Sequence, residues 1–300
     1  MPDVVKDKVA VVTGAGRGIG RGVAMLMAAQ GAKVVVVDPG VNVDGTGADA
    51  TPADQVVREI TEAGGVAAAC HESVATMEGG EAAVQAAIDA FGKLDVVVTC
   101  HGILRDRMVF RDDVIAVHLK GTFAVVKHAC ILFRQQRSGR VITFTSESGL
   151  VGNSGQANYG AAKSGIAGFT KVVARDMGRY GVTANSIAPR AQTRMIGNIP
   201  ASASAIRAQG GVAGIAGEED LGTADPDDVA PFVVYLASDY ASNVNGQTFL
   251  VYGGDVALMS QPRPERCIYN DGQWSLDVLA PLARDYLTRG IGNPAPAPTS

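Results

Sequence analysis

Short runs of apolar, largely β-branched residues recur along most of the chain. Runs of this length and composition are typical of strands that are buried on both faces of a sheet. Seven strands are predicted, over Lys8–Thr13, Lys33–Asp38, Val66–Cys70, Asp95–Thr99, Gly139–Thr145, Val182–Pro189 and Phe249–Tyr252.

Between these runs the apolar residues follow the three-to-four spacing of amphipathic helices. Helices are predicted from about Ile19, and then over Ala53–Ala63, Glu78–Phe91, Asp112–Gln135 and the segment from Tyr159 to Arg179. Strands that alternate with helices in this way predict an α/β fold with a parallel sheet.

The alternation stops after the last predicted strand. We expect one dinucleotide-binding domain over residues 1–258, including a substrate loop over 190–225, followed by an extension over 259–300. The extension contains one amphipathic helix within Ser275–Arg289 and a proline- and alanine-rich end. Since this helix is too small to form a domain, we expect it to pack on a neighbouring surface, such as that of another subunit.

Composition limits the classes of partner. The 300 residues are 47% hydrophobic and 19% charged, which allows a substantial core. The net charge of −4 comes from mixed acids and bases without a basic stripe, so neither nucleic acid nor a membrane is an expected partner. The four cysteines lack the spacing of metal ligands, which predicts reduced thiols and no metal. Without a secretory signal or a long apolar run, a cytoplasmic location is expected.

A glycine-rich segment, TGAGRGIG at residues 13–20, lies between the first strand and the first helix. Glycines let the backbone come close to a phosphate, and a helix N-terminus offers free N–H groups with a partial positive charge. Asp38 ends the second strand, where a carboxylate can accept hydrogen bonds from an adenosine ribose and would repel a 2′-phosphate. The pattern therefore favours NAD over NADP. Arg17 is the contrary indication, because it could either reach a 2′-phosphate or be a solvated loop charge.

Other strand ends also contribute candidates. Ser73 follows the third strand, where its hydroxyl could contact the adenine edge or cap the loop. Gly102 follows the fourth strand and would let the backbone pass close to the cofactor. The neighbouring His101 has no evident partner and is interpreted as a loop residue rather than a base. The polar, glycine-rich segment Pro39–Pro52 is interpreted as a surface insertion.

Tyr159 and Lys163 are four positions apart, and a helix places such a pair on one face about one turn apart. A tyrosine is a poor base at neutral pH unless a nearby positive charge favours the phenolate, and Lys163 is placed to supply that charge. Ser146 stands at the end of a predicted strand, which is the edge where α/β sheets place ligands. Such a pair also occurs in ordinary surface helices, so its significance depends on the nucleotide loop and on Ser146.

Together these residues resemble the short-chain dehydrogenase/reductase family over about residues 6–258. The matching motifs are TGAGRGIG at 13–20, Asp38, Ser146, the YxxxK pair at 159 and 163, and the PxxxT string from Pro189 to Thr193. In more detail, the sequence is similar to the (3R)-hydroxyacyl-CoA dehydrogenase unit of multifunctional β-oxidation enzymes and to its free-standing bacterial relatives. The segments that carry this finer similarity are GILRDRM at 102–108, VHLKGTF at 117–123 and GNSGQANYGAAK at 152–163.

The resemblance implies a single doubly wound, Rossmann-type parallel sheet of about seven strands with helices on both faces, and usually a homodimer or homotetramer. It implies that Tyr159 exchanges a proton with the alcohol oxygen, and that Ser146 holds this oxygen. Lys163 would lower the pKa of Tyr159 and bind the nicotinamide ribose. His118 stands where a relay asparagine is common, which makes it a candidate to pass the proton. Thr193 would orient the carboxamide.

The candidate cofactor-binding residues are therefore Gly14, Arg17, Gly18, Ile19, Gly20, Asp38, Ser73, Val74, Gly102, Lys163, Pro189 and Thr193. The chain departs from the family pattern at three places. The string Thr99-Cys100-His101-Gly102 replaces the usual NNAG, so an asparagine thought to brace the sheet and the cofactor loop is missing. The segment between Met108 and Val114 is shorter than in similar proteins, and Arg190 replaces a glycine that often follows the proline.

The motifs predict an NAD-dependent oxidoreductase that acts on a small-molecule substrate. The enzyme would transfer a hydride between nicotinamide and a secondary alcohol or its ketone, with a 3-hydroxyacyl-CoA or a steroid-like alcohol as the expected substrate. The departures leave an alternative open, namely a catalytically weak or silent NAD-binding regulatory module of the same fold.

Overall fold

The computed structural model describes residues 3–103, 113–153, 155–191 and 225–292. Their framework is one eight-stranded sheet with the strand order β3-β2-β1-β4-β5-β6-β7-β8. All neighbouring strands are parallel except β8, which runs antiparallel to β7. The strands are β1 (Val9–Thr13), β2 (Lys33–Val37), β3 (Val66–Cys70), β4 (Val96–Thr99), β5 (Gly139–Phe144), β6 (Val182–Arg190), β7 (Thr248–Tyr252) and β8 (Asp255–Leu258).

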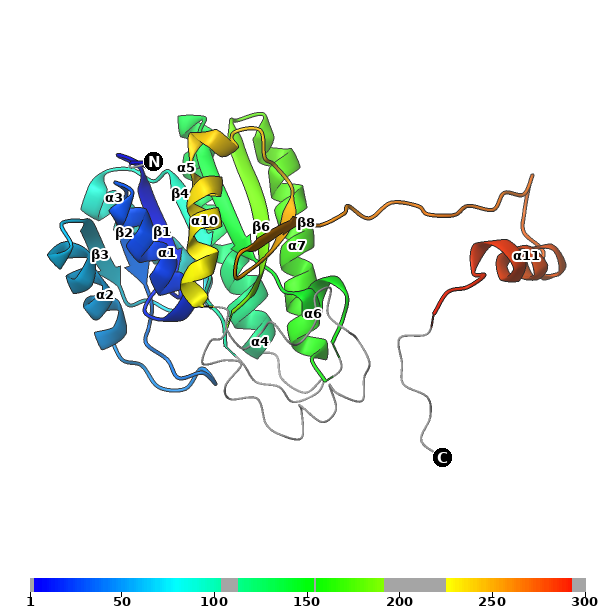
Figure 1. Cartoon of the computed structure of the whole chain (residues 1–300), viewed down its shortest axis with the longest axis horizontal. Helices are drawn as coiled ribbons and strands as arrows, with labels where there is room; N and C mark the ends of the chain where they lie inside the picture. The colour runs from blue at the N-terminus through cyan, green and yellow to red at the C-terminus, as the bar shows by residue number, and fades with distance from the viewer. Residues whose placement is uncertain (1–2, 104–112, 154, 192–224, 293–300) are drawn as a thin grey trace.

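Helices cover both faces of the sheet (Figure 1). One face carries α1 (Gly18–Ala29), α2 (Thr51–Glu62) and α10 (Ala230–Ala237), and the other carries α3 (Met77–Phe91), α5 (Gly121–Gln136) and α7 (Ala157–Gly178). The shorter elements are α4 (Asp113–Ile115), a π-helix at Ala116–Lys120, α6 (Glu147–Leu150), 3-10 helices at Pro226–Val229 and Asp239–Ala241, α11 (Leu276–Leu282) and a second π-helix at Ala283–Leu287.

The core lies in two layers because each central strand buries both of its faces. In β1, Ala10 and Val12 pack under α1 and α10, whereas Val9 and Val11 pack on the side of α3 and α5. All four side chains are at most 1% exposed. This explains why the strands are continuous apolar runs in the sequence rather than alternating ones.

The strand order places a topological switch point between β1 and β4. These strands are neighbours in the sheet, yet from β1 the chain continues outward to β2 and β3, and from β4 it continues outward to β5 and β6. At such a point the connections leave on opposite faces, and a crevice opens at the carboxyl ends of the strands. The fold therefore confirms the predicted doubly wound sheet and indicates where to look for a ligand.

Three elements differ from the prediction. The sheet has an eighth strand, because the chain reverses after Tyr252 and pairs β8 along the edge of β7. The helix predicted over Asp112–Gln135 contains the π-helix Ala116–Lys120, a form that is often found at functional sites. The helix predicted within Ser275–Arg289 is likewise divided between α11 and a π-helix, with Pro281 inside α11.

The helical stretch Asp113–Gln136 is long and apolar enough to cross a bilayer by length and composition alone. Of its most apolar 18-residue window, 44% is buried in the fold. Its inward residues Val125, Ala129 and Phe133 belong to the core layer that α3 and the sheet also share. The apolar composition is therefore accounted for by the interior of the domain.

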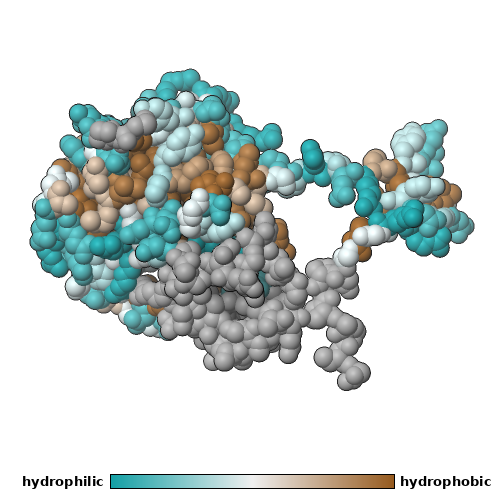
Figure 2. Space-filling model, in the orientation of Figure 1, coloured by the Kyte–Doolittle hydropathy of each residue, from teal (hydrophilic) through white to brown (hydrophobic). Residues whose placement is uncertain are grey.

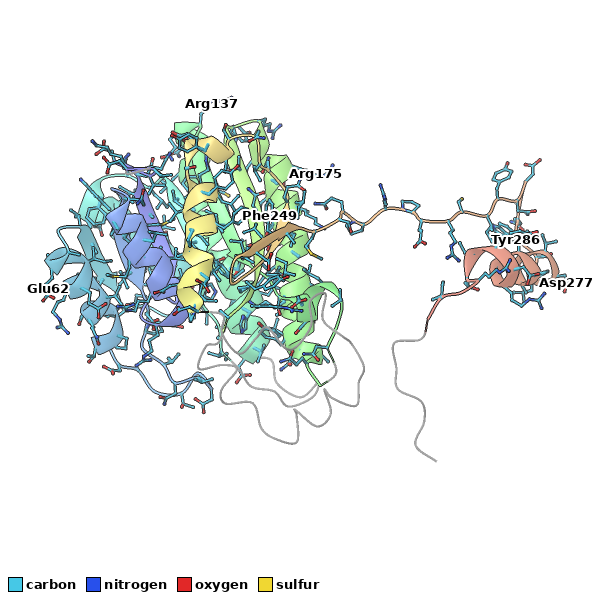
Figure 3. The ribbon with its side chains drawn as sticks, in the orientation of Figure 1. Glu62, Arg137, Arg175, Phe249, Asp277 and Tyr286 are labelled. Atoms are coloured by element: carbon cyan, nitrogen blue, oxygen red, sulfur yellow. The ribbon has the colours of Figure 1, made fainter. Side chains whose placement is uncertain are left out.

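The C-terminal extension runs away from the sheet and places α11 at a distance from it (Figures 1 and 2). Tyr286 and Asp277 lie on this outlying helical segment (Figure 3). Large apolar side chains are exposed along it, namely Tyr269, Trp274, Leu276, Val278, Tyr286 and Ile291. The substrate loop expected over 190–225 falls almost entirely outside the described residues.

Candidate active site

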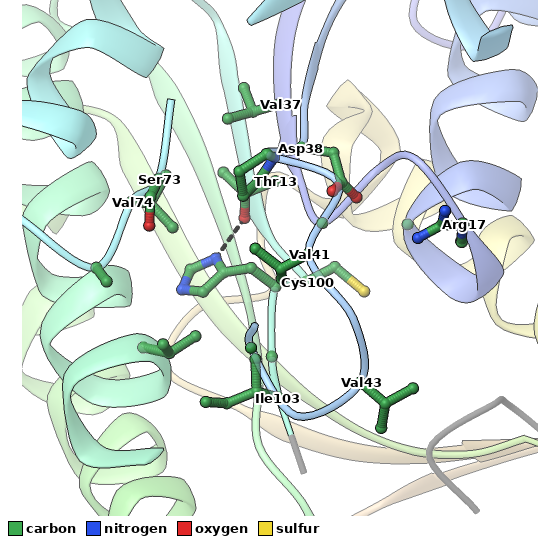
Figure 4. Close-up of a pocket in the computed structure, with 18 of the residues that line it drawn as sticks. Thr13, Arg17, Val37, Asp38, Val41, Val43, Ser73, Val74, Cys100 and Ile103 are labelled. Carbon is green, nitrogen blue, oxygen red and sulfur yellow. Dashed lines mark hydrogen bonds between the residues drawn. The ribbon is translucent and has the colours of Figure 1, made fainter. Parts of the chain in front are cut away.

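A cavity of about 360 Å³ lies at the carboxyl ends of β1, β2, β3 and β4, at the switch point (Figure 4). Each of these strands, or the loop that follows it, contributes residues to the wall. Nine predicted cofactor-binding residues line this one cavity: Gly14, Arg17, Gly18, Ile19, Gly20, Asp38, Ser73, Val74 and Gly102.

Two glycines at the junction of β1 and α1 cannot carry a side chain, namely Gly14 in the loop and Gly20 in the first turn of α1. Gly14 has a φ of +66°, and a Cβ added there would lie 2.6 Å from the Cα of His101. A Cβ on Gly20 would lie 2.2 Å from the carbonyl oxygen of Gly14. The loop is therefore folded tightly against the end of β4, which leaves its backbone as part of the cavity wall.

Asp38 is held in the cavity wall by two backbone donors. The Gly16 N–H donates to its Oδ2 at 2.8 Å, and the Gly40 N–H donates to its Oδ1 at 2.7 Å. An ionised carboxylate has about four acceptor positions, so each oxygen can accept one more hydrogen bond. Asp38 is thus held in position and can still accept hydrogen bonds from ribose hydroxyls.

The segment after β2 is more than the surface insertion that was predicted. Val41, Asn42, Val43 and Gly45 line the cavity, and Gly45 lies against the side chain of Ile103 from the loop after β4 (Figure 4). The two valines within an otherwise polar stretch were the available signal for a buried role. This segment closes one side of the cavity with apolar side chains.

His101 lies in the loop after β4, as predicted, but it is buried and has a partner that the sequence did not reveal. Its Nδ1 lies 2.6 Å from the Thr13 hydroxyl, whose oxygen also lies 3.4 Å from the Val98 carbonyl (Figure 4). The tautomer of the ring decides which of the two atoms is the donor. Burial, and next the nearby charge of Lys163, lower the pKa of His101 to about 3, so the ring is neutral. A neutral imidazole here ties β1 to β4, which replaces the brace expected from the missing asparagine.

Tyr159 lies between His118 and Lys163. The rings of Tyr159 and His118 meet edge to face with their centroids 5.2 Å apart. The Lys163 Nζ lies 5.6 Å from the centre of the Tyr159 ring. The structure therefore places two other predicted catalytic residues, His118 and Lys163, next to the Tyr159 ring.

The Lys163 ammonium is buried and has a fixed partner. Its Nζ donates to the Phe144 carbonyl at the end of β5, at 2.8 Å. Burial lowers the pKa of Lys163 from 10.5 to about 8. The amine is still mostly protonated at pH 7. Since an ammonium has three donors, two remain for other acceptors.

Ser146 is positioned by close packing between its loop and α7. The hydroxyl of the preceding Thr145 donates to the Lys163 carbonyl at 2.7 Å. A Cβ on Gly149 would lie 2.6 Å from the Lys163 backbone, so only glycine lets α6 approach α7 this closely. The Ser146 hydroxyl oxygen accepts the Ser148 N–H at 3.3 Å as the N-cap of α6. Its proton is thus left to donate to a substrate oxygen.

His118 belongs to the π-helix Ala116–Lys120 and is almost fully buried. Its Nε2 lies 2.8 Å from the Ile103 carbonyl and 3.1 Å from the Ile103 N–H. Its Nδ1 has no partner among the described residues. Burial, and next the Lys163 charge, hold the pKa of His118 well below its ordinary value. A neutral ring that donates through Nε2 presents a lone pair at Nδ1, so it can accept a proton only transiently.

Some predicted residues lie elsewhere. Pro189 and Lys163 do not line the cavity around the adenosine-binding candidates. Thr193 and the shortened stretch after Met108 lie outside the described residues. Arg190, which stands where a glycine was expected, is paired with Glu147. Sequence reasoning missed Thr13 and Glu147 because a threonine ending a strand and a glutamate starting a helix are both commonplace.

Comparisons with known proteins agree with this geometry. A family model described as "Enoyl-(Acyl carrier protein) reductase" matches residues 14–255. Hydroxyacyl-CoA dehydrogenase ChsB1 of Mycobacterium tuberculosis is 40% identical, over 94% of this chain and 89% of that protein. The peroxisomal hydratase-dehydrogenase-epimerase of Saccharomyces cerevisiae is 37% identical, over 88% of this chain and 28% of that protein. The crystal structure of a short chain dehydrogenase from Mycobacterium avium has a TM-score of 0.79 at 40% identity and covers 98% of both chains.

Replacing Lys163 by Met is expected to change how stability depends on pH. The folded state holds the pKa of Lys163 at about 8 against 10.5 for an ordinary lysine. Between these values the unfolded chain binds more protons, so this group makes the wild type more stable as the pH rises. Relative to Lys163→Met, the wild type should gain about 2 kcal/mol in free energy of unfolding between pH 8 and pH 10.

Urea unfolding at several pH values measures this gain. The Lys120→Met variant, which removes an exposed lysine, is the matched control. A wild-type gain over Lys163→Met that is no larger than its gain over the control would contradict the burial of a protonated Lys163.

Proposed function

Because the chain belongs to the short-chain dehydrogenase/reductase family, we propose that this oxidoreductase transfers a hydride between NAD and the 3-hydroxy or 3-keto group of an acyl-CoA thioester. The observation that carries the proposal is the position of Tyr159 between a buried ammonium and a buried imidazole. The similarity to a hydroxyacyl-CoA dehydrogenase supports the thioester as the substrate class. A steroid-like alcohol is the second substrate class to be tested.

The residues around the phenol can move one proton. In the oxidation direction Tyr159 accepts the hydroxyl proton of the substrate, and the Ser146 hydroxyl donates a hydrogen bond to the same oxygen. Lys163 favours the phenolate through its charge. His118 remains our candidate to take part in this proton exchange, with its Nδ1 as the accepting atom. The nicotinamide would supply the hydride acceptor for oxidation and the hydride donor for reduction.

The cavity residues suit a dinucleotide. The glycine backbone and the N-terminus of α1 can hold the diphosphate, and Asp38 can hold the adenosine ribose. Ser73 and Val74 line the side of the cavity away from Arg17, where a base can lie (Figure 4). Lys163 has donors left for the nicotinamide ribose. Thr193 remains our candidate for the carboxamide, and Pro189 for the same end of the site.

Of the three departures from the family pattern that motivated the alternative of a silent binding module, two involve described residues that have partners. His101 bonds Thr13 where the asparagine brace is missing, and Arg190 pairs with Glu147. Neither change disturbs the Tyr159–Lys163 pair. We therefore favour an active enzyme over a regulatory module.

Activity is tested by following NADH formation over a panel of 3-hydroxyacyl-CoA thioesters and steroid alcohols. Wild-type protein should turn over at least one thioester. Tyr159→Phe should lower kcat by about 100-fold or more, since general acid–base groups contribute at least that much. The control Tyr240→Phe alters an exposed tyrosine in a 3-10 helix and should leave kcat unchanged. Equal turnover by Tyr159→Phe would refute the assignment, whereas binding of NAD without any turnover would favour the silent module.

Cofactor preference is tested by calorimetry. The wild type should bind NAD more tightly than NADP, because the Asp38 carboxylate repels a 2′-phosphate. Asp38→Asn keeps the side-chain shape and removes the charge, so the ratio of the two Kd values should shift toward NADP by about tenfold or more. Asp54→Asn, at an exposed carboxylate on α2 that does not line the cavity, is the control. Tighter binding of NADP to the wild type, abolished by Arg17→Ala, would assign Arg17 as the phosphate contact and overturn the preference.

We also propose a homodimer or homotetramer in which the extension over 259–300 contacts another subunit. Leu276 is 79% exposed and Tyr286 is 67% exposed on this outlying segment, and such side chains are normally covered. Light scattering should give an oligomeric mass for the full chain and a lower mass for the double variant Leu276→Asp with Tyr286→Asp. Asp277→Asn on the same helix is the control. An unchanged mass would exclude the extension from the interface.

A cytoplasmic location remains part of this proposal, supported by the mixed surface charge and the small net charge of −4. Cell fractionation checks it, and recovery of the protein in a membrane or secreted fraction would contradict it.

A further inference from the structure

A buried ion pair joins the loop that carries Ser146 to the end of the neighbouring strand. Arg190 is the last residue of β6, and Glu147 is the first residue of α6, directly after Ser146. The Arg190 Nη2 donates to Glu147 Oε1 at 2.7 Å, and its Nε donates to Glu147 Oε2. The guanidinium therefore binds both carboxylate oxygens of Glu147. Such a bidentate pair fixes the orientation of the two side chains as well as the distance between them.

The pair is held on both sides. The Arg190 side chain is 7% exposed and that of Glu147 is 18% exposed. The guanidinium carbon lies 5.5 Å from the centre of the Tyr252 ring, and Tyr252 is the residue that pairs with Arg190 across β6 and β7. Glu147 is thus tied through Arg190 to two strands of the sheet, whereas the rest of α6 rests on α7.

Stability alone is a weak reason for such a pair, because the cost of removing two charges from water offsets much of their attraction. Its place in the fold suggests another reason. Ser146 packs through Thr145 and Gly149 onto the Lys163 turn of α7, which holds the side of the loop that faces α7. Another side faces the end of β6, where Arg190 lies. The Glu147–Arg190 pair secures that side.

We propose that the Glu147–Arg190 ion pair is a positioning device that sets the Ser146 hydroxyl relative to Tyr159. This inference rests on the proposed function, since it assigns a role in holding the residue that contacts the substrate oxygen. Neither residue of the pair takes part in the chemistry. Its contribution is geometric, and small displacements of an aligned group are costly to the rate.

The test is a double-mutant cycle. Glu147→Gln alone should lower kcat by about 10- to 100-fold while the Kd for NAD changes less than about threefold. In a Ser146→Ala background the same substitution should lower kcat less than about threefold, because Glu147 acts through the hydroxyl that is already missing. An equal loss in both backgrounds would overturn the inference.

Two further variants guard against simple misfolding. Arg190→Lys keeps the positive charge but cannot form the bidentate hydrogen bonds to Glu147, so it should reproduce the kcat loss of Glu147→Gln. Glu59→Gln breaks the Arg21–Glu59 ion pair between α1 and α2, and should leave kcat unchanged. A drop in melting temperature with unchanged kcat for Glu147→Gln and Arg190→Lys would show that the pair is structural only, and would refute a positioning role.

A second readout does not depend on turnover. Hydrogen exchange of the peptide that spans residues 144–153 should become at least tenfold faster in Glu147→Gln and remain unchanged in Glu59→Gln. If the wild type shows no turnover but exchange accelerates in this peptide, the proposed function fails and the positioning of the Ser146 loop stands. If the wild type is active and exchange is unaffected, the proposed function stands and the positioning role fails.

Discussion

The burial of one ammonium group is the constraint on which the site depends. Lys163 projects from α7 into the interior and donates to the carbonyl of Phe144, the last residue of β5. Burying a charge is costly unless hydrogen-bond acceptors replace the lost water, and the Phe144 carbonyl is such an acceptor. The packing of α6 on α7, the glycine at Gly149 and the Thr145 hydroxyl all serve to place the Ser146 loop against the Lys163 turn. The site is thus organised around the buried Lys163 ammonium.

The cofactor side of the crevice depends on close approach between two loops. The first glycine of the β1–α1 loop sits against His101, and Gly102 sits against the ring of His118. The two imidazole rings therefore occupy space that the glycines leave open. The His101 ring links β1 to the end of β4, and the His118 ring contacts Tyr159. Both rings are kept neutral by burial and by Lys163. The same charge that serves Tyr159 therefore adds to the effect of burial in keeping both histidines neutral.

The sequence predicted the parts of the molecule that depend on local pattern. The apolar runs specified the seven parallel strands, and nine cofactor candidates lie around one cavity. The misses depend on tertiary contacts. His101 carries no local sign that Thr13 is its partner, since the two are far apart in sequence and meet only when β1 pairs with β4. Arg190 likewise contacts Glu147 only because β6 lies beside β5, the strand that precedes Glu147. The sequence did not predict the π-helix around His118, because the spacing of its apolar residues still resembles that of an α-helix.

The most direct test of the central claim is an ultraviolet difference titration of the tyrosinate band. The spectrum of Tyr159→Phe is subtracted from that of the wild type, and the same is done in a Lys163→Met background, so that only the Tyr159 phenolate remains. If the buried ammonium favours the phenolate, the Tyr159 band will appear at lower pH with Lys163 present than with Met in its place. Appearance at the same pH in both backgrounds would contradict the account.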